Sequence, residues 1–195
     1  MSELIDQIYE YSRANYVPII DDDSKEILLN LVREINPKHI LEIGTAVGYS
    51  SSLMLECCDG DIDTIEIDED RRNLAMKLWK DKKLEDRVHS YLGNVDEILE
   101  DVIKGKEYDF VFIDGPKSRY LDHLIKCKDN VAPHGVIFAD DILFFGMVKG
   151  DEHVPHKHRT IVRHLREFLS YLENSTEFET NILDTGNGIA IITKK

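Results

Sequence analysis

The stretch from Ile40 to Ser51, which reads ILEIGTAVGYSS, constrains the fold of this chain more than any other. An apolar run leads to the acid Glu42 and to Gly44, and Gly48 then opens an amphipathic segment. This order predicts a strand, a tight turn and a helix. Gly44 permits a turn that a Cβ would obstruct, and Gly48 lets a ligand or the strand approach the start of the helix. Such a unit is typical of the nucleotide-type site in a doubly wound α/β sheet.

The carboxylate of Glu42 narrows the class of ligand. The glycine spacing is G-x-x-x-G rather than the G-x-G-x-x-G of dinucleotide binders, and a carboxylate at this place repels a pyrophosphate. Both observations disfavour an NAD-linked dehydrogenase. S-adenosylmethionine fits better, because it carries an ammonium and a sulfonium and no phosphate. A strand–helix turn that binds nothing remains the plainer alternative.

Alternating strand and helix patterns predict a single α/β domain over residues 1–195 with a mostly parallel, seven-stranded sheet. Within this domain, a helix at residues 4–16 and an extended linker to Ile20 are expected before the first strand. This helix is expected to cover the main domain or a partner subunit of a homodimer. A second helix is expected from a cap at Asp23 or Ser24 to Ile35. The expected strands are residues 39–44, 61–67, 88–92, 108–113 and 135–139, then an antiparallel pair at 178–183 and 188–193.

The composition of the chain indicates in which compartment the protein works and which partners it can bind. The formal charge of −14 argues against broad non-specific binding of nucleic acid, which requires a cationic surface. An odd number of cysteines without a C-x-x-C pattern suits a reducing compartment. The sequence has neither a signal-peptide pattern nor an apolar run long enough to cross a membrane. We therefore expect a cytoplasmic protein without a membrane partner.

Acidic or polar residues follow nearly every predicted strand, at the sheet edge where ligands of such folds bind. Because like charges gathered at one edge repel, a cationic group is expected to compensate them. Glu66 is placed to accept hydrogen bonds from ribose hydroxyls, although an exposed acid before a helix is the alternative. The residues concerned are Glu42, Glu66, Asn94, Asp114, Asp140 and Asp141.

Asp114, Asp140 and Asp141 offer the hard oxygen ligands that Mg²⁺ prefers. Adjacent residues of a regular strand face opposite ways, so Asp140 and Asp141 can both ligate only if the chain bends between them. Asp141 as the cap of the following turn is the alternative. Asn94 and Val95, after the third strand, are expected to meet the edge of an adenine.

Four motifs together resemble the small cation-dependent O-methyltransferases related to the catechol and caffeoyl-CoA enzymes. They are E-I-G-T-A-V-G-Y-S-S, I-E-I-D, D-F-V-F-I-D-G-P-K-S-R-Y and F-A-D-D-I-L. The likeness runs from about Val17 to the C-terminus, and the branch that methylates 5-hydroxyuridine in tRNA looks most similar. It implies a Rossmann-like class I methyltransferase domain with S-adenosylmethionine and Mg²⁺ or Mn²⁺ as cofactors.

The resemblance also implies roles for individual residues. Ser50 would contact the methionine carboxylate of the cofactor, Ile20 would pack near it, and Gly44, Gly48, Glu42 and Asp114 would belong to the same site. Lys117 would be the general base, with a pKa lowered by the nearby cation. The related enzymes usually carry Asp-Asn where this sequence has Asp140-Asp141, and the extra charge would tighten the metal or alter its preference.

Residues 144–166 reverse the charge of this acidic chain and are expected to rim the active site. The segment carries His153, His156, Lys157, His158, Arg159, Arg163, His164 and Arg166. Such a rim suits an anionic substrate, and Lys157, Arg159 and Arg163 are assigned to an RNA. Our first hypothesis is methylation of 5-hydroxyuridine at the wobble position within a tRNA anticodon stem-loop. A small catechol-like phenol is the second, and a non-catalytic nucleotide-binding module, which Lys117 and the acids disfavour, is the third.

Overall fold

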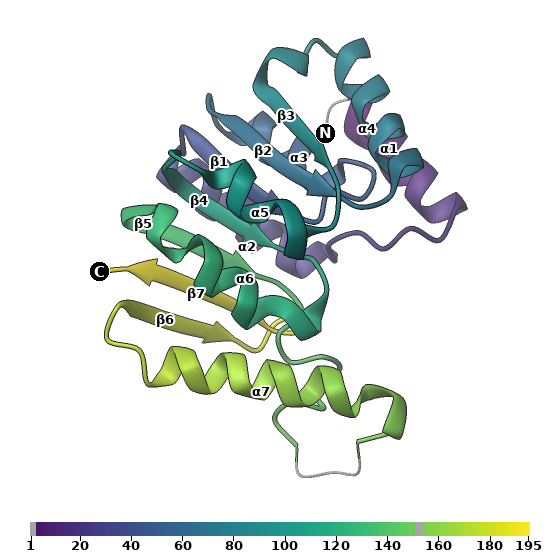
Figure 1. Ribbon diagram of the computed structural model, residues 1–195. Helices are drawn as coiled ribbons and strands as arrows, with labels where there is room; N and C mark the ends of the chain where they lie inside the picture. Colours follow the sequence, from purple (N-terminus) through teal and green to yellow (C-terminus); the bar gives the residue numbers. More distant parts are fainter. Residues whose placement is uncertain (1–2, 151–153) are drawn as a thin grey trace.

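Five parallel strands form the centre of the structure, a computed structural model that describes residues 3–150 and 154–195. Two further strands add an antiparallel end, and the sheet order is β3-β2-β1-β4-β5-β7-β6. The predicted mostly parallel, seven-stranded sheet is therefore confirmed (Figure 1). The strands are β1 (His39–Ile43), β2 (Asp61–Glu66), β3 (Val88–Leu92), β4 (Tyr108–Ile113), β5 (Val131–Ala139), β6 (Phe178–Leu183) and β7 (Ile189–Lys194).

Helices cover both faces of the sheet and make a three-layer α/β/α domain (Figure 1). One face carries α1 (Glu3–Ala14), α2 (Asp22–Ile35), α3 (Tyr49–Cys57) and α4 (Glu69–Asp81), and the other carries α5 (Val95–Ile103), α6 (Tyr120–Cys127) and α7 (Arg159–Glu173). Alternate residues of β4 pack into the two cores: Phe110 and Phe112 on the first face, Val111 and Ile113 on the second. All four are fully buried, which explains the apolar run Phe110–Ile113 in this central strand.

The N-terminal helix α1 packs on its own domain, which was one of the two predicted arrangements. Leu4, Ile5 and Ile8 are buried in the first core, and α1 contacts α3. Among the described residues, no helix has the length and apolar character needed to span a membrane.

Two predicted boundaries are wrong for local reasons. Asp21, rather than Asp23 or Ser24, caps α2, because its extended backbone lets its carboxylate accept from the backbone amides of both of those residues. β5 begins at Val131, four positions before its predicted start, because a register shift between Tyr108 and Phe110 lets the early residues pair with β4.

The carboxyl ends of the central strands lie side by side and place the next residues of the chain together. The amide of Asp114 donates to the carbonyl of Ile43 at 3.0 Å, and the amide of Asp140 donates to the carbonyl of Ile113 at 3.2 Å. The residues that follow β1, β4 and β5 therefore meet at one edge of the sheet.

Candidate active site

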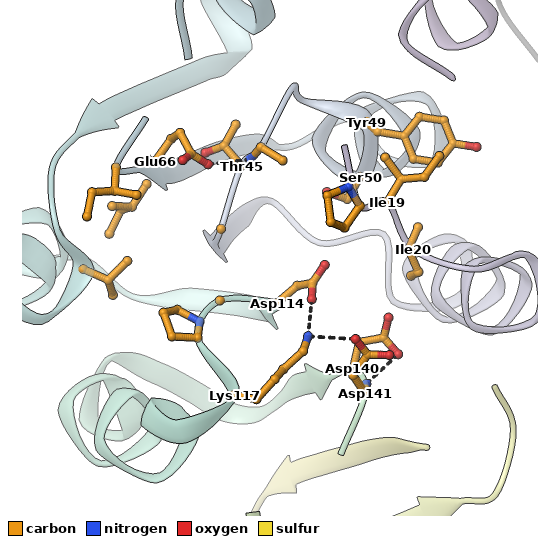
Figure 2. A pocket seen from close by; sticks show the side chains of 18 of the residues that line it. Ile19, Ile20, Thr45, Tyr49, Ser50, Glu66, Asp114, Lys117, Asp140 and Asp141 are labelled. Atoms are coloured by element: carbon orange, nitrogen blue, oxygen red, sulfur yellow. Dashed lines mark hydrogen bonds and ion pairs between the residues drawn. The ribbon is translucent and has the colours of Figure 1, made fainter. Parts of the chain in front are cut away.

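A cavity of about 590 Å³ opens at this edge, a size ordinary for a small-molecule site. Most of the predicted site residues line it; they are Ile20, Gly44, Ser50, Glu66, Asn94, Val95, Asp114, Lys117, Asp140 and Asp141. The predicted residues that do not line it are Glu42, Gly48, Lys157, Arg159 and Arg163. Figure 2 shows Glu66 and Thr45 at one end, with Lys117 and the aspartates at the other.

The two glycines of the β1–α3 turn each lie where a Cβ would collide with a different part of the protein. Gly44 has φ +102°, and a Cβ there would lie 2.6 Å from the carbonyl oxygen of Asp114. Gly44 therefore lets the ends of β1 and β4 approach. Gly48 has φ +79°, and its Cβ would lie 2.6 Å from the ring of Trp79. The close approach that Gly48 permits is thus to a tryptophan of α4 rather than to the strand.

The carboxylate of Glu42 lies behind the cavity wall, which corrects its predicted contact with the ligand. It is fully buried and accepts hydrogen bonds from the hydroxyls of Ser50, Ser51 and Thr64. Burial raises the pKa of Glu42 from its usual 4.5 to about 7, against the three hydroxyls, which lower it. Ser50 lines the cavity and donates to Glu42 at 2.6 Å, so Glu42 acts on the site by orienting Ser50.

At the other end, backbone amides hold the carboxylate of Glu66. One oxygen accepts from the amide of Ala46 at 2.6 Å, and the other accepts from the amide of Asp68 at 2.9 Å. Each oxygen keeps a further lone pair for a ligand. The side-chain oxygen of Asn94 caps α5 by accepting from the amide of Asp96, and Asn94 also lines the cavity.

Lys117 lies between two carboxylates at the aspartate end (Figure 2). Its Nζ is 2.6 Å from Asp114 Oδ1 and 3.1 Å from Asp141 Oδ2, and it donates to the hydroxyl of Tyr120 at 2.9 Å. Burial acts to lower the pKa of Lys117, but Tyr120, Asp114 and Asp141 together raise it well above 10.5. With these partners alone the lysine is protonated, and the predicted partly neutral base requires the cation beside it.

The chain bends at Asp141, as joint use of the two neighbouring aspartates requires. Asp141 has φ +58°, in the left-handed region. Its carboxylate and those of Asp140 and Asp21 each place an oxygen within 4.8 Å of the others. Asp114 lies outside this group and is held by Lys117. Three hard oxygen donors at this distance suit Mg²⁺ or Mn²⁺. Asp114 of the predicted trio lies beside them, since its charge acts on Asp140.

Asp21 was missed as a site residue because it precedes the sheet in the chain. The run D-D-D-S before a helix was the available signal, but it indicated only a cap. Asp140 is buried, and burial together with the charges of Asp114 and Asp141 raises its pKa to about 7. This end of the cavity therefore favours positive charge.

The basic side chains of the segment 144–166 that the structure describes do not line the cavity. Arg159 and Arg163 line a separate groove of about 340 Å³ on α7, and Lys157 is exposed. The N-terminal end of α7 is on the same side of the molecule as the carboxyl ends of the parallel strands (Figure 1). Phe145, from the same segment, does line the cavity and is 70% exposed. His153 falls outside the described residues.

Comparisons with known proteins identify the family of this chain. The sequence model of the O-methyltransferase family matches residues 1–195. Caffeoyl-CoA O-methyltransferase from Medicago sativa is 31% identical over 87% of this chain and 72% of its own length. Tapetum-specific methyltransferase 1 from Arabidopsis thaliana is 28% identical over 97% of this chain and 85% of its own. The crystal structure of a provisionally assigned caffeoyl-CoA O-methyltransferase from Staphylococcus aureus superposes with a TM-score of 0.91, at 29% identity, over 100% of this chain and 93% of that chain.

A doubly wound sheet whose strand-end cavity holds a fixed carboxylate at one end and a lysine among aspartates at the other defines an α/β methyltransferase. The fold is shared with Podospora anserina PaMTH1, solved with S-adenosylhomocysteine (TM-score 0.88, 21% identity, 100% of this chain and 89% of that chain). The chain belongs to the O-methyltransferase family and is an S-adenosylmethionine-dependent O-methyltransferase of the caffeoyl-CoA type.

Proposed function

We propose that this enzyme methylates an acidic ring hydroxyl with the help of a divalent cation, and that its acceptor is 5-hydroxyuridine at the wobble position of tRNA. The observation that carries the chemistry is the pairing of Lys117 with Asp114 and Asp141 beside the acids Asp21 and Asp140, in the cavity that Glu66 closes at its other end. A hydroxyl seated between these ends faces both the base and the cofactor.

Residues at the Glu66 end are those that would hold S-adenosylmethionine. Glu66, with both oxygens fixed by amides, suits the two ribose hydroxyls. Ser50, oriented by Glu42, suits the methionine carboxylate, with Ile20 packed beside it. Val95 lines the wall where an adenine would lie. Glu66 forms no ion pair with a lysine or arginine among the described residues, and Arg71, which lines the same cavity, is paired with Asp68. A carboxylate in this position suits a ligand without phosphate.

The aspartates at the other end would hold Mg²⁺ or Mn²⁺ and fix the acceptor oxygen. When bound, such a cation lowers the pKa of a hydroxyl and favours its oxyanion. Lys117 is the residue placed to take the proton, because its Nζ lies within the same cluster. Compensation of the negative charge around it would lower its pKa toward the value a base requires.

The tRNA acceptor is supported by the charge of the segment beside the cavity. Residues 154–166 contain four Lys or Arg side chains and no acid, on a chain whose formal charge is −14. The N-terminal end of α7, which begins at Arg159, lies on the same side of the molecule as the carboxyl ends of the parallel strands (Figure 1). A stem-loop that enters the cavity by one nucleotide would run past this end. Phe145 at the cavity wall offers a face on which a flipped-out base can stack.

A small catechol-like phenol is the second candidate acceptor, favoured by the caffeoyl-CoA type of the relatives and by the same Phe145. One assay separates the two. Transfer of labelled methyl from S-adenosylmethionine is measured with hydroxylated tRNA, unmodified tRNA and a catechol, each with Mg²⁺ and with excess chelator. We expect label in hydroxylated tRNA only, loss with chelator, and an affinity that falls steeply with salt. Label in the catechol alone would refute the tRNA acceptor, and full activity in chelator would refute the cation.

A further inference from the structure

Asp21 lies where the N-terminal segment meets the aspartates at the end of β5. Its carboxylate has an oxygen within 4.8 Å of oxygens of both Asp140 and Asp141. We propose that Asp21 is a ligand of the divalent cation, and that the cation thereby fastens the segment 18–21 over the cofactor cavity. This inference rests on the proposed cation dependence and assigns it a residue from outside the sheet.

The structure holds the carboxylate of Asp21 firmly in place. Its Oδ1 accepts from the amides of Asp23 at 3.0 Å and Ser24 at 2.9 Å, at the positive end of α2. The loop between β6 and β7 lies close to the other oxygen, because a Cβ on Gly186 would lie 2.5 Å from Asp21 Oδ2. A ligand position fixed on several sides loses little freedom when a cation binds.

A buried hydroxyl joins Asp21 to the aspartate at the strand end. Ser24 Oγ lies 3.0 Å from Asp21 Oδ2 and 3.0 Å from Asp140 Oδ1, and Ser24 is fully buried. One hydroxyl has one proton, so it can donate to only one of these carboxylates at a time. The carboxylates of Asp21 and Asp140 are therefore held close together, while the hydroxyl of Ser24 can satisfy only one of them with a hydrogen bond.

The carboxylates of Asp21 and Asp140 lie close together, and the described residues provide no ion pair to either of them. In the ranges 3–150 and 154–195, no lysine or arginine contacts either carboxylate. Lys25 turns to Asp22 instead, and Lys117 contacts Asp114 and Asp141. Because close carboxylates repel in a partly buried site, a divalent cation among them gains an unusually favourable position.

A cation held here would connect two parts of the molecule. Pro18, Ile19, Ile20 and Asp21 line the cavity from the N-terminal side, and Asp140 and Asp141 line it from the sheet. A shared cation would fix the first group against the second. Binding of cation and cofactor would then be coupled, and by reciprocity each would tighten the other.

The variant Asp21→Asn tests the assignment without removing the helix cap, because Asn caps as well as Asp. Asp22→Asn is the matched control: it removes the same charge one residue away, on a side chain that is exposed and outside the cluster. Mn²⁺ is the probe, with binding measured by electron paramagnetic resonance and calorimetry. We expect the Kd for Mn²⁺ to rise at least about tenfold in Asp21→Asn and to stay within about twofold in Asp22→Asn.

Two further readouts separate the outcomes. The metal-free melting temperature of Asp21→Asn reports whether the fold is kept, and its rise with Mn²⁺ should be smaller than that of the wild type. Mn²⁺ should tighten S-adenosylhomocysteine binding about fivefold or more in the wild type and less in Asp21→Asn. Equal Mn²⁺ affinity in the wild type and Asp21→Asn, or equal weakening in both variants, would overturn the inference alone. A wild type that binds no Mn²⁺ would also overturn the proposed cation dependence.

Discussion

The buried carboxyl group of Glu42 makes the stability of this enzyme depend on pH in a way that a single substitution isolates. Burial raises the pKa of Glu42 from 4.5 to about 7 in the folded state. In the unfolded chain the group regains its ordinary pKa. Between these values the folded protein binds the proton and the unfolded chain does not, so stability falls as pH rises. Above pH 7 the folded state carries the full cost of a buried carboxylate.

The size of this cost follows from the pKa difference. At about 1.4 kcal/mol per pKa unit, a rise from 4.5 to about 7 corresponds to about 3 kcal/mol. Glu42→Gln removes the titration, while its amide can still exchange hydrogen bonds with Ser50, Ser51 and Thr64, whose hydroxyls both donate and accept. Any repacking offset is independent of pH, because neither the amide nor the hydroxyls titrate in this range.

Urea unfolding of both proteins at several values between pH 4.5 and 8 measures the effect. We subtract the free energy of unfolding of the wild type from that of Glu42→Gln. This difference should become more positive by about 3 kcal/mol as the pH rises across this interval. Ser51→Ala removes one donor that lowers the pKa, so its own decline in stability should extend to higher pH. A difference that stays constant with pH would show that Glu42 ionises normally, and would refute the reasoning.

Three predictions concern the reaction itself. Glu66→Ala should weaken S-adenosylmethionine binding by about 1.5–3 kcal/mol in calorimetry, since it removes charged hydrogen bonds to the ribose, and unchanged affinity would remove Glu66 from the site. Lys117→Ala should cut turnover by about 10²–10⁴-fold while cofactor affinity stays nearly intact, and the defect should shrink as pH rises; a pH-independent defect would assign the lysine to substrate binding. Replacing Arg159 and Arg163 together by Ala should raise KM for tRNA and flatten its salt dependence but spare a small phenol, whereas equal losses on both substrates would indicate a role in the fold.

Much of the fold could be predicted because local pattern and tertiary packing agree. The run Tyr108–Ile113 is apolar except for Asp109, and the strand is buried from Phe110 onward because both of its faces are covered by helices. The start of β5 could not be predicted, because it depends on a register shift against β4 that no local pattern encodes. A strand boundary that is set by pairing can be predicted only when the position of the partner strand is known.

The site could be predicted only as a set of strand ends. Topology alone brings Asp114 and Asp140 to one edge, and the sequence predicted both. It did not predict that Glu42 would turn inward, because its partners, such as Thr64, come from a neighbouring strand. It also missed the proximity of Asp21 to Asp140, because these residues, more than a hundred positions apart, are brought together only by tertiary packing.

The same charges that would favour a cation also keep Lys117, the proposed base, protonated. Asp114 and Asp141 contact Lys117 and raise its pKa, and the charge of Asp141 likewise raises the pKa of Asp140. One ammonium among several carboxylates leaves this end of the cavity negative, so a proton on Lys117 is held more tightly than in water. Compensation of the aspartates is therefore the condition under which the lysine can accept a proton. Cation binding and base strength would then be two consequences of one cluster, and an acceptor hydroxyl would lose its proton only in a loaded site.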